Sequence, residues 1–485
     1  MRMTGIVLIA MLFGLISQNL IAEPPVSKCK TALDDYVYQD DPTFKWEVVK
    51  TVEGKLSNTY MIKLTSQTWR TKKDVDRPVW DHWLVVVKPK ELKSEKAFIL
   101  VGGGKTGRSA PGKADGMTSL IAESTGSIVA ELKAIPNQTL TFHHDGTPRV
   151  EDDLIGYCWA QYLETGDVTW LPRLPMVKSV VKAMDCLEEW SEKQGKKIDG
   201  FVIAGASKRG WTTWMTGAVD KRVQAIVPIV IDVANTSLSL QHHAEVYGFW
   251  AEAIGNYYQH KLLQRSDHPR MKEIYEVVDP YYYIDRLTMP KYVLNGSGDQ
   301  FFCPDSSQFY YADLKGEKLL RYVPNADHSL KAPDAITSLI AWYQMFLTDR
   351  ARPKPTWSFE KDGSIHVHSD IQPRKVLLWH ATNPKARDFR LKTIGKAYKS
   401  TVLKRQKDGS WEGSIQEPKE GWTAFFVELE YASGGIFPLK TTTAIRVLPD
   451  VLPFKGIDLN TVPYEPLMNK KDDSKVSQSE TSHKK

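Results

Sequence analysis

The expected fold is decided by the stretch Phe201-Val202-Ile203-Ala204-Gly205-Ala206-Ser207-Lys208-Arg209-Gly210. Its first four residues form an apolar run of the length of a buried strand, and residues 209–219 have a helical pattern. A strand, a sharp turn that carries a serine and a helix make up the arrangement called a nucleophile elbow. The usual pattern is G-x-S-x-G, whereas Arg209 stands two residues after Ser207 here and the glycine follows one residue later. The string alone fits an ordinary glycine-rich turn equally well, so its interpretation depends on the rest of the chain.

The segments around this stretch indicate an α/β plan. Two alternating segments, residues 44–51 and 59–69, are typical of an antiparallel hairpin, and a third strand is expected at 83–87. Continuous apolar runs, which favour strands buried on both faces, follow at residues 97–101, 127–132, 201–204, 223–231 and 292–295. Helical patterns lie between them, notably at residues 151–163 and 176–192. The sequence therefore predicts a largely parallel sheet with helices.

The chain of 485 residues is long enough for two or more domains. Residues 1–22 are typical of a secretory signal peptide, which would direct the protein to secretion or the periplasm. We expect an α/β domain over residues 23–351, with a helical cap inserted at about 232–289. Short alternating segments at residues 364–368, 376–380, 411–415, 424–429 and 442–447 predict a β-sandwich-like domain over 352–449, with the boundary between 350 and 356. Residues 450–485 are expected to be an extended segment and a disordered tail.

Composition excludes several classes of protein. The net charge of +6 is mild for this length, and no basic helix indicates a nucleic-acid partner. No stretch after the signal peptide is apolar enough for a stable membrane span. The four cysteines, Cys29, Cys158, Cys186 and Cys303, have no metal-ligand spacing, and in an oxidising compartment they could form two disulfides in any of three connectivities.

Two loops after later strands offer partners for Ser207. A serine hydroxyl becomes a nucleophile when a histidine takes its proton and a carboxylate orients that histidine. Asp299 lies in the Gly-Ser-Gly-Asp loop after the strand at 292–295, and His328 lies in the loop after a strand at 319–323, before a helix at 333–347. Serine, acid and histidine in this order match the order in α/β-hydrolases. Asp305 is a weaker candidate that looks like a helix N-cap, and Asp327 is weaker because adjacent residues tend to point apart.

The negative charge that forms on the substrate oxygen needs two N–H donors. Lys208, which follows the serine, would supply one of them. The other is expected from Gly103, Gly104 or Lys105, in the triglycine loop after the strand at 97–101. The same loop ends like a nucleotide-binding P-loop, but the required first glycine is replaced by Ile99.

The remaining candidates concern the substrate pocket. The excursion at 232–289 is rich in aromatic residues and would roof the pocket, with Trp250 and Tyr257 as contacts. Arg209 could present a cation to an acidic substrate or form a buried ion pair. Neighbouring histidines, His143-His144 and His242-His243, favour surface or pocket-rim positions over a metal site. Trp211 and Trp214 are interpreted as core residues, as are most of the tryptophans in the C-terminal module, which could alternatively stack on sugars.

With these motifs in place, the chain resembles the PhoPQ-activated pathogenicity-related proteins, a family with the α/β-hydrolase fold. The resemblance spans roughly residues 34–447 and includes the strings Trp80-Asp81-His82-Trp83, Glu151-Asp152-Asp153-Leu154 and Gly205 to Gly210. It implies the hydrolase fold and, position by position, Ser207, Asp299 and His328 as the triad. It implies no substrate, and one eukaryotic branch of the family is described as a secreted autocrine repressor of proliferation.

The sequence thus supports two hypotheses. The first is a secreted serine hydrolase that needs no cofactor or metal and cleaves an ester or peptide bond in a small-molecule or peptide substrate. The second is a secreted signalling or binding protein on a hydrolase scaffold, whose partner would be a cell-surface receptor. A complete triad in the correct order favours catalysis.

Overall fold

The structure is a computed structural model, and it describes residues 30–468. The expected signal peptide, Cys29 and the expected tail from residue 469 onward lie outside the described residues.

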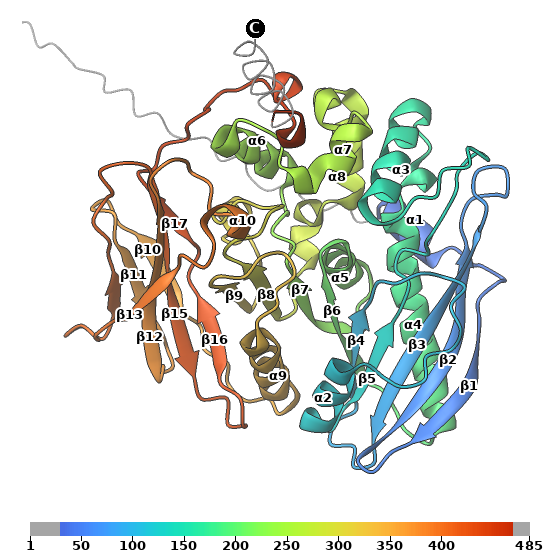
Figure 1. Cartoon of the computed structure of the whole chain (residues 1–485). Coiled ribbons are helices and arrows are strands. Elements are labelled where there is room, and N and C mark those ends of the chain that lie inside the picture. Colours follow the sequence, from blue (N-terminus) through green and yellow to red (C-terminus); the bar gives the residue numbers. More distant parts are fainter. Residues whose placement is uncertain (1–29, 469–485) are drawn as a thin grey trace, which may run out of the picture.

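A nine-stranded sheet forms the centre of the molecule (Figure 1). Its strands, in spatial order, are β1 (Lys45–Glu53), β2 (Ser57–Thr68), β3 (Val79–Pro89), β5 (Ile128–Leu132), β4 (Lys96–Val101), β6 (Gly200–Ala206), β7 (Val223–Ile229), β8 (Lys291–Gly296) and β9 (Lys318–Val323). The first three are antiparallel to their neighbours, and all pairs from β5 to β9 are parallel. The order and the mixed start are those of the α/β-hydrolase fold, as the sequence predicted.

Helices cover both faces of the parallel strands. One face packs on α4 (Arg173–Lys193) and α5 (Lys208–Val219), and the other packs on α2 (Gly116–Thr125) and α9 (Pro333–Leu347). Ile203 contributes to the first of these cores, and its neighbour Val202 to the second. This alternation explains why the strands appear in the sequence as unbroken apolar runs.

The chain between β7 and β8 is the expected helical excursion. It contains α6 (Thr236–Tyr247), α7 (Gly255–Gln259) and α8 (Pro269–Val278), joined by the short 3₁₀ helices η2 (Glu252–Ile254), η3 (Leu263–Arg265) and η4 (Pro280–Arg286). Figure 1 shows these helices together with α3 (Glu151–Thr165) at the end of the sheet where β6 to β9 finish. Two further helices, α1 (Ala32–Tyr38) and η1 (Val168–Trp170), precede the excursion in the chain.

The C-terminal strands form two antiparallel sheets. One contains β10 (Thr356–Phe359), β11 (Ile365–His368) and β14 (Trp411–Gly413), and the other contains β13 (Lys399–Val402), β12 (Lys375–Asn383), β15 (Trp422–Tyr431), β16 (Leu439–Thr442) and β17 (Arg446–Leu448). The single strand that was expected at 442–447 is wrong, because residues 443–445 interrupt it and β16 and β17 pair with different parts of β15. The tryptophans of this region pack against the cores rather than standing free: Trp357, Trp379, Trp411 and Trp422.

These sheets pack directly on the central sheet. The Tyr292 hydroxyl of β8 donates a hydrogen bond of 2.6 Å to the Lys440 carbonyl of β16, and the Tyr322 amide of β9 donates one of 2.9 Å to the Thr442 hydroxyl. A short helix, α10 (Leu391–Ile394), lies between β12 and β13, and η5 (Ser306–Phe309) lies between β8 and β9.

Residues 449–468, which we call the return segment, run back from the C-terminal sheets to the helical excursion. The Trp250 amide donates to the Pro463 carbonyl (2.7 Å), and the Glu465 amide donates to the Trp250 carbonyl (3.0 Å). The ring of Tyr464 stacks on Tyr258 with centroids 4.9 Å apart. The Glu465 carboxylate forms an ion pair with Arg390 at 2.9 Å. The segment also contains η6 (Leu459–Thr461). The contacts with Trp250, Tyr258 and Arg390 hold the return segment against residues that are far away in the sequence.

Candidate active site

Ser207 occupies a strained turn between β6 and α5. Its backbone angles, φ 58° and ψ −127°, are unfavourable for a residue with a side chain. A Cβ atom on Gly205 would lie 2.6 Å from the Arg209 carbonyl oxygen, and one on Gly210 would lie 2.7 Å from the Gly205 carbonyl oxygen. Both positions therefore require glycine, and the expectation from the displaced elbow pattern is confirmed at the level of the backbone.

Asp299 and His328 are joined by a hydrogen bond. His328 Nδ1 lies 2.8 Å from Asp299 Oδ2, and the carboxylate is almost fully buried. The other carboxylate oxygen accepts from the Phe301 amide at 2.7 Å. An ionised carboxylate can only accept, so this contact assigns the proton to Nδ1 and leaves Nε2 as an acceptor. Nε2 is buried and has no hydrogen-bond partner within residues 30–468.

The two competing carboxylates have other partners. Asp305 is buried between His242, whose Nε2 lies 2.9 Å from its Oδ1, and the Arg387 guanidinium at 2.8 Å. It occupies the N-cap position of η5 but makes no side-chain cap bond, because His242 and Arg387 engage both of its carboxylate oxygens. Asp327 accepts from the amide and hydroxyl of Ser329.

The topology brings the serine and the histidine loop to one edge of the sheet. β6, β8 and β9 run parallel, so the loops after their carboxyl ends emerge on the same side. No hydrogen bond links the Ser207 hydroxyl to His328 in the described part of the chain. The Phe301 ring connects the two instead: it packs on the His328 ring with centroids 4.3 Å apart and lines the same cavity as Ser207. In ligand-free hydrolases the bond from serine to histidine is often long, so this geometry is compatible with a triad.

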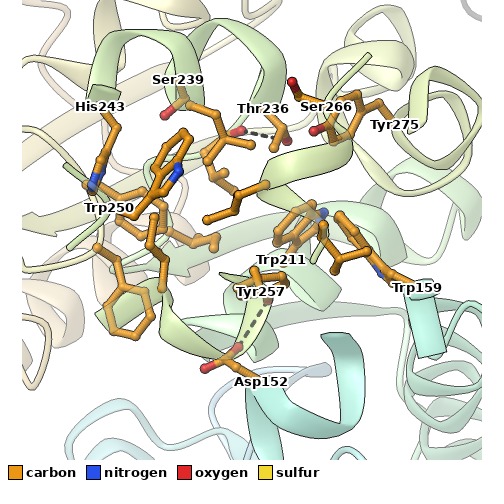
Figure 2. A pocket seen from close by; sticks show the side chains of 18 of the residues that line it. Asp152, Trp159, Trp211, Thr236, Ser239, His243, Trp250, Tyr257, Ser266 and Tyr275 are labelled. Carbon is orange, nitrogen blue, oxygen red and sulfur yellow. Dashed lines mark hydrogen bonds between the residues drawn. The ribbon is translucent and has the colours of Figure 1, made fainter. Parts of the chain in front are cut away.

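Ser207 lines a cavity whose wall is formed by residues of α5 and of the helical excursion. Figure 2 shows this cavity with Trp211, Trp250 and Tyr257 labelled in its wall. The space between its walls measures about 980 Å³ with its mouth included. Trp250 and Tyr257, the two aromatic residues expected at the pocket, both line it. Trp211, which the sequence suggested as core, also lines it, because the first turn of α5 faces the cavity as well as the sheet.

A cluster of charges lies beside the serine. The Lys208 ammonium is buried and contacts the carboxylates of Glu151 at 3.0 Å and Asp152 at 3.1 Å. Burial opposes ionisation of Glu151, but the hydrogen bond and charge of Arg209 and the charge of Lys208 lower the pKa of Glu151 to about 2. Glu151 and Asp152 begin α3, so the first two residues of the acidic string at 151–153 pair with the two basic residues that follow Ser207. Sequence reasoning noted both strings but did not link them.

Arg209 points away from the cavity that Ser207 lines. Its guanidinium donates to Glu151 Oε1 and to the Ile135 carbonyl, both at 2.6 Å. This is the ion pair that the sequence left open as the alternative to a substrate contact. The guanidinium also covers Gly103, where a Cβ atom would lie 2.7 Å from Arg209 Nη2.

The triglycine loop lies near the elbow but faces a different cavity. Gly103, Gly104 and Lys105 line a second cavity together with His82 and other residues of β3. The carbonyl oxygens of Gly103 and Gly104 accept hydrogen bonds from the Ala134 amide and from Gln138 Nε2, which hold the loop in place. The Lys208 amide stands at the first position of α5, directly after Ser207.

The two histidine pairs differ: His143 and His144 are exposed, as expected, whereas His242 and His243 are not. His242 and His243 are buried, because Asp305 and the Ala251 amide supply hydrogen-bond partners inside the fold. His143 Nδ1 contacts the Tyr157 hydroxyl at 2.9 Å, and His144 is exposed. Among residues 30–468, no three potential metal ligands come together.

The cysteines do not form two disulfides. Cys158, Cys186 and Cys303 are buried free thiols in separate parts of the fold. Burial raises the pKa of each of these thiols, so they are kept in the protonated form. None of the helices within residues 30–468 has the length and apolarity that crossing a bilayer requires.

Comparison with known proteins gives a family and a set of similar folds. The family model described as PhoPQ-activated pathogenicity-related protein matches residues 33–390. The chain is 40% identical over 453 residues to autocrine proliferation repressor protein A of Dictyostelium discoideum, covering 87% of this chain and 92% of that protein.

Among solved structures, acetyl xylan esterase 1 from Thermoanaerobacterium aligns with a TM-score of 0.46 and 15% identity, over 67% of this chain and 95% of the esterase. An S-formylglutathione hydrolase from Agrobacterium tumefaciens aligns with a TM-score of 0.39 and 15% identity, over 63% of this chain and 99% of that chain.

Proposed function

The chain belongs to the PhoPQ-activated pathogenicity-related protein family, and from this premise we propose that it is a secreted serine hydrolase with Ser207, His328 and Asp299 as its triad. The observation that carries the proposal is the combination of a strained serine at the β6–α5 turn with a buried His328–Asp299 pair. The Nε2 atom of this histidine has no other partner in the described residues. A strained serine conformation costs stability, and such strain is retained where it serves a function.

The proposed reaction follows from the roles of these atoms. The Ser207 hydroxyl oxygen attacks the carbonyl carbon of an ester or peptide bond while His328 Nε2 takes the hydroxyl proton. Asp299 keeps the other proton on Nδ1 and stabilises the imidazolium that forms. The imidazolium then protonates the leaving group, and the acyl group remains on Ser207 until a water molecule, activated by the same Nε2, releases it as the acid.

The oxyanion would be stabilised by the backbone amide of Lys208. That amide lies at the N-terminus of α5, where unpaired N–H groups and the helix dipole favour negative charge. The second donor is proposed from the Gly103–Lys105 loop, which contacts the elbow through Arg209.

Labelling with a fluorophosphonate probe tests the proposal. We expect the wild-type protein to be labelled and Ser207→Ala to remain unlabelled, with a loss of about 10⁶ in turnover if the serine acts as in other triads. Ser400→Ala, which changes an exposed serine on β13, is the matched control and should be labelled like the wild type. Labelling of Ser207→Ala, or no labelling of well-folded wild type, contradicts the proposal.

Secretion is part of the same proposal and has its own test. Cleavage after residue 22 predicts that protein collected outside the cytoplasm begins at Glu23, which N-terminal sequencing measures. Recovery of full-length protein from the cytoplasm alone would contradict it.

A second candidate function is signalling through a cell-surface receptor. The observation that favours it is the 40% identity with a protein that is named as a proliferation repressor. Ser207→Ala separates the two candidates: if the purified variant still represses proliferation as the wild type does, the biological role does not require hydrolysis.

A further inference from the structure

We propose that the cavity beside Ser207 binds the acyl part of the substrate, and that the substrate is an ester of an apolar carboxylic acid. This inference rests on the proposed hydrolase function and adds the chemical class of the substrate. It is carried by the composition of the cavity wall, by the pairing of every charged group in it and by the position of His328.

The wall of the cavity is made mainly of aromatic and aliphatic side chains. Trp211 comes from α5, Trp250 and Met271 from the helical excursion, and Phe301 from the loop after β8 (Figure 2 labels the first two). Leu459 of the return segment also contributes. An apolar substrate group binds favourably to a wall of this kind because its apolar surface is removed from water. The same wall offers few hydrogen-bond partners to a charged substrate group.

The charged groups in the wall are already neutralised by each other. Lys208 contacts two carboxylates, and one of them, Asp152, also accepts from the Tyr257 hydroxyl at 3.1 Å. Figure 2 shows the latter contact at the edge of the cavity. An acidic or basic substrate group placed there would have to break these pairs, which is costly for buried charges.

His243 adds no charge to the cavity. Its Nε2 accepts a hydrogen bond from the Ala251 amide at 3.2 Å, and burial lowers the pKa of the imidazole to about 3. The ring is therefore neutral at physiological pH, and it stacks on Trp250.

The position of His328 decides which part of the ester lies in the cavity. In a triad the histidine protonates the leaving group, so the leaving group is on the histidine side and the acyl group on the other. Phe301 also lines another cavity, whose wall includes Gln300 and Asp327. The Gln300 side chain accepts a hydrogen bond from the His328 amide, and Asp327 precedes His328 in the chain. The alcohol is thus directed to this cavity, whose wall is the more polar of the two, and the acyl group to the more apolar cavity beside Ser207.

A series of p-nitrophenyl esters tests the assignment directly. Each buried methylene is expected to raise kcat/KM by up to about fourfold. We expect kcat/KM to rise at least tenfold from the acetate to the hexanoate or octanoate. A flat profile, or a maximum at the acetate, overturns the inference while leaving the hydrolase function intact. A rise with the length of the alcohol instead of the acid, in a series of alkyl acetates, overturns the orientation.

Two substitutions on α6 provide a matched pair. Leu240 lines the cavity, whereas Leu238, two residues earlier, is 45% exposed and does not. Leu240→Trp should shift the preferred acid to a shorter chain and lower the ratio of octanoate to acetate kcat/KM at least tenfold. Leu238→Trp should leave that ratio unchanged. Equal ratios in both variants contradict the assignment.

Binding to the Ser207→Ala variant separates the inference from the reaction. Octanamide is a neutral probe with an apolar chain, and calorimetry should show that it binds more tightly than acetamide and more weakly after Leu240→Trp is added. Octanamide binding without fluorophosphonate labelling of the wild type would retain the cavity assignment and refute the hydrolase. Fluorophosphonate labelling with no preference for octanamide would retain the hydrolase and refute the assignment.

Discussion

Replacement of Glu151 by glutamine tests whether the charge cluster stabilises the elbow. In the wild type the Glu151 carboxylate forms ion pairs with both Arg209 and Lys208. The pKa of Glu151 falls from an ordinary 4.5 to about 2, which would stabilise the folded state by about 3 kcal/mol at neutral pH if the group were shielded from water. The side chain is 36% exposed, so solvent screening reduces the expected loss in Glu151→Gln to about 1.5 kcal/mol.

The pH dependence of this loss has a definite sign. A carboxylate whose pKa is lowered on folding stabilises the protein above the pKa of the unfolded chain, and that stabilisation is lost as the pH falls toward the pKa of the folded state. The difference between wild type and Glu151→Gln should therefore be full at pH 7 and shrink between about pH 4.5 and pH 2. Urea unfolding followed by tryptophan fluorescence at several pH values measures it.

A control is available on the same helix. Glu164 forms an exposed ion pair with Arg265 near the other end of α3, so Glu164→Gln should cost less than about 0.5 kcal/mol. If Glu151→Gln is as stable as the wild type at pH 7, or if its loss is the same at pH 3 and pH 7, the reasoning about the cluster is refuted.

Three other substitutions have expected outcomes. Asp299→Asn should lower kcat/KM for the best ester by about 10⁴, because the amide no longer fixes the tautomer of the histidine; a loss below tenfold would contradict this role. Asp232 is buried against the hydroxyls of Tyr310 and Tyr322, and burial raises its pKa to about 7. The Asp232 carboxyl therefore binds its proton more tightly in the folded state than in the unfolded chain. The stabilisation that this protonated carboxyl gives is lost as the pH rises from about 4 to 7. Asp232→Asn should remove that slope in thermal unfolding, and an unaltered slope would count against it. Glu465→Ala should cost about 1–2 kcal/mol and speed trypsin cleavage within the return segment, since Arg390 loses a partner; unchanged cleavage would argue against the anchoring role.

Local patterns in the sequence were sufficient to predict most strands of the central sheet. Hydrophobic periodicity depends on neighbours a few residues away, so the helix predicted at 333–347 matches α9 residue for residue, and the parallel strands begin and end within two residues of their expected limits. The same logic located Asp299 and His328 on the loops after β8 and β9, and these side chains are hydrogen-bonded in the structure.

Features that depend on distant contacts could not be predicted in this way. The burial of His242 requires Asp305 and Arg387, which lie 63 and 145 residues further along the chain. The position of Trp211 at the cavity depends on how the helical excursion covers α5. Nothing in the composition of the return segment indicates that Leu459 reaches the cavity, because the residues that hold this segment are spread from residue 245 to residue 422.

The return segment sets a limit on when the protein can become functional during its synthesis. Ser207, Asp299 and His328 have all left the ribosome while residues 449–468 are still being added, and a domain can begin to fold at that stage. The cavity wall nevertheless lacks Leu459, and Trp250 lacks its two backbone partners, until the last part of the chain is free. A nascent chain thus carries the residues of the proposed triad before the wall of the cavity is complete. A fragment that ends at residue 448, before the return segment, would be held permanently at that earlier stage.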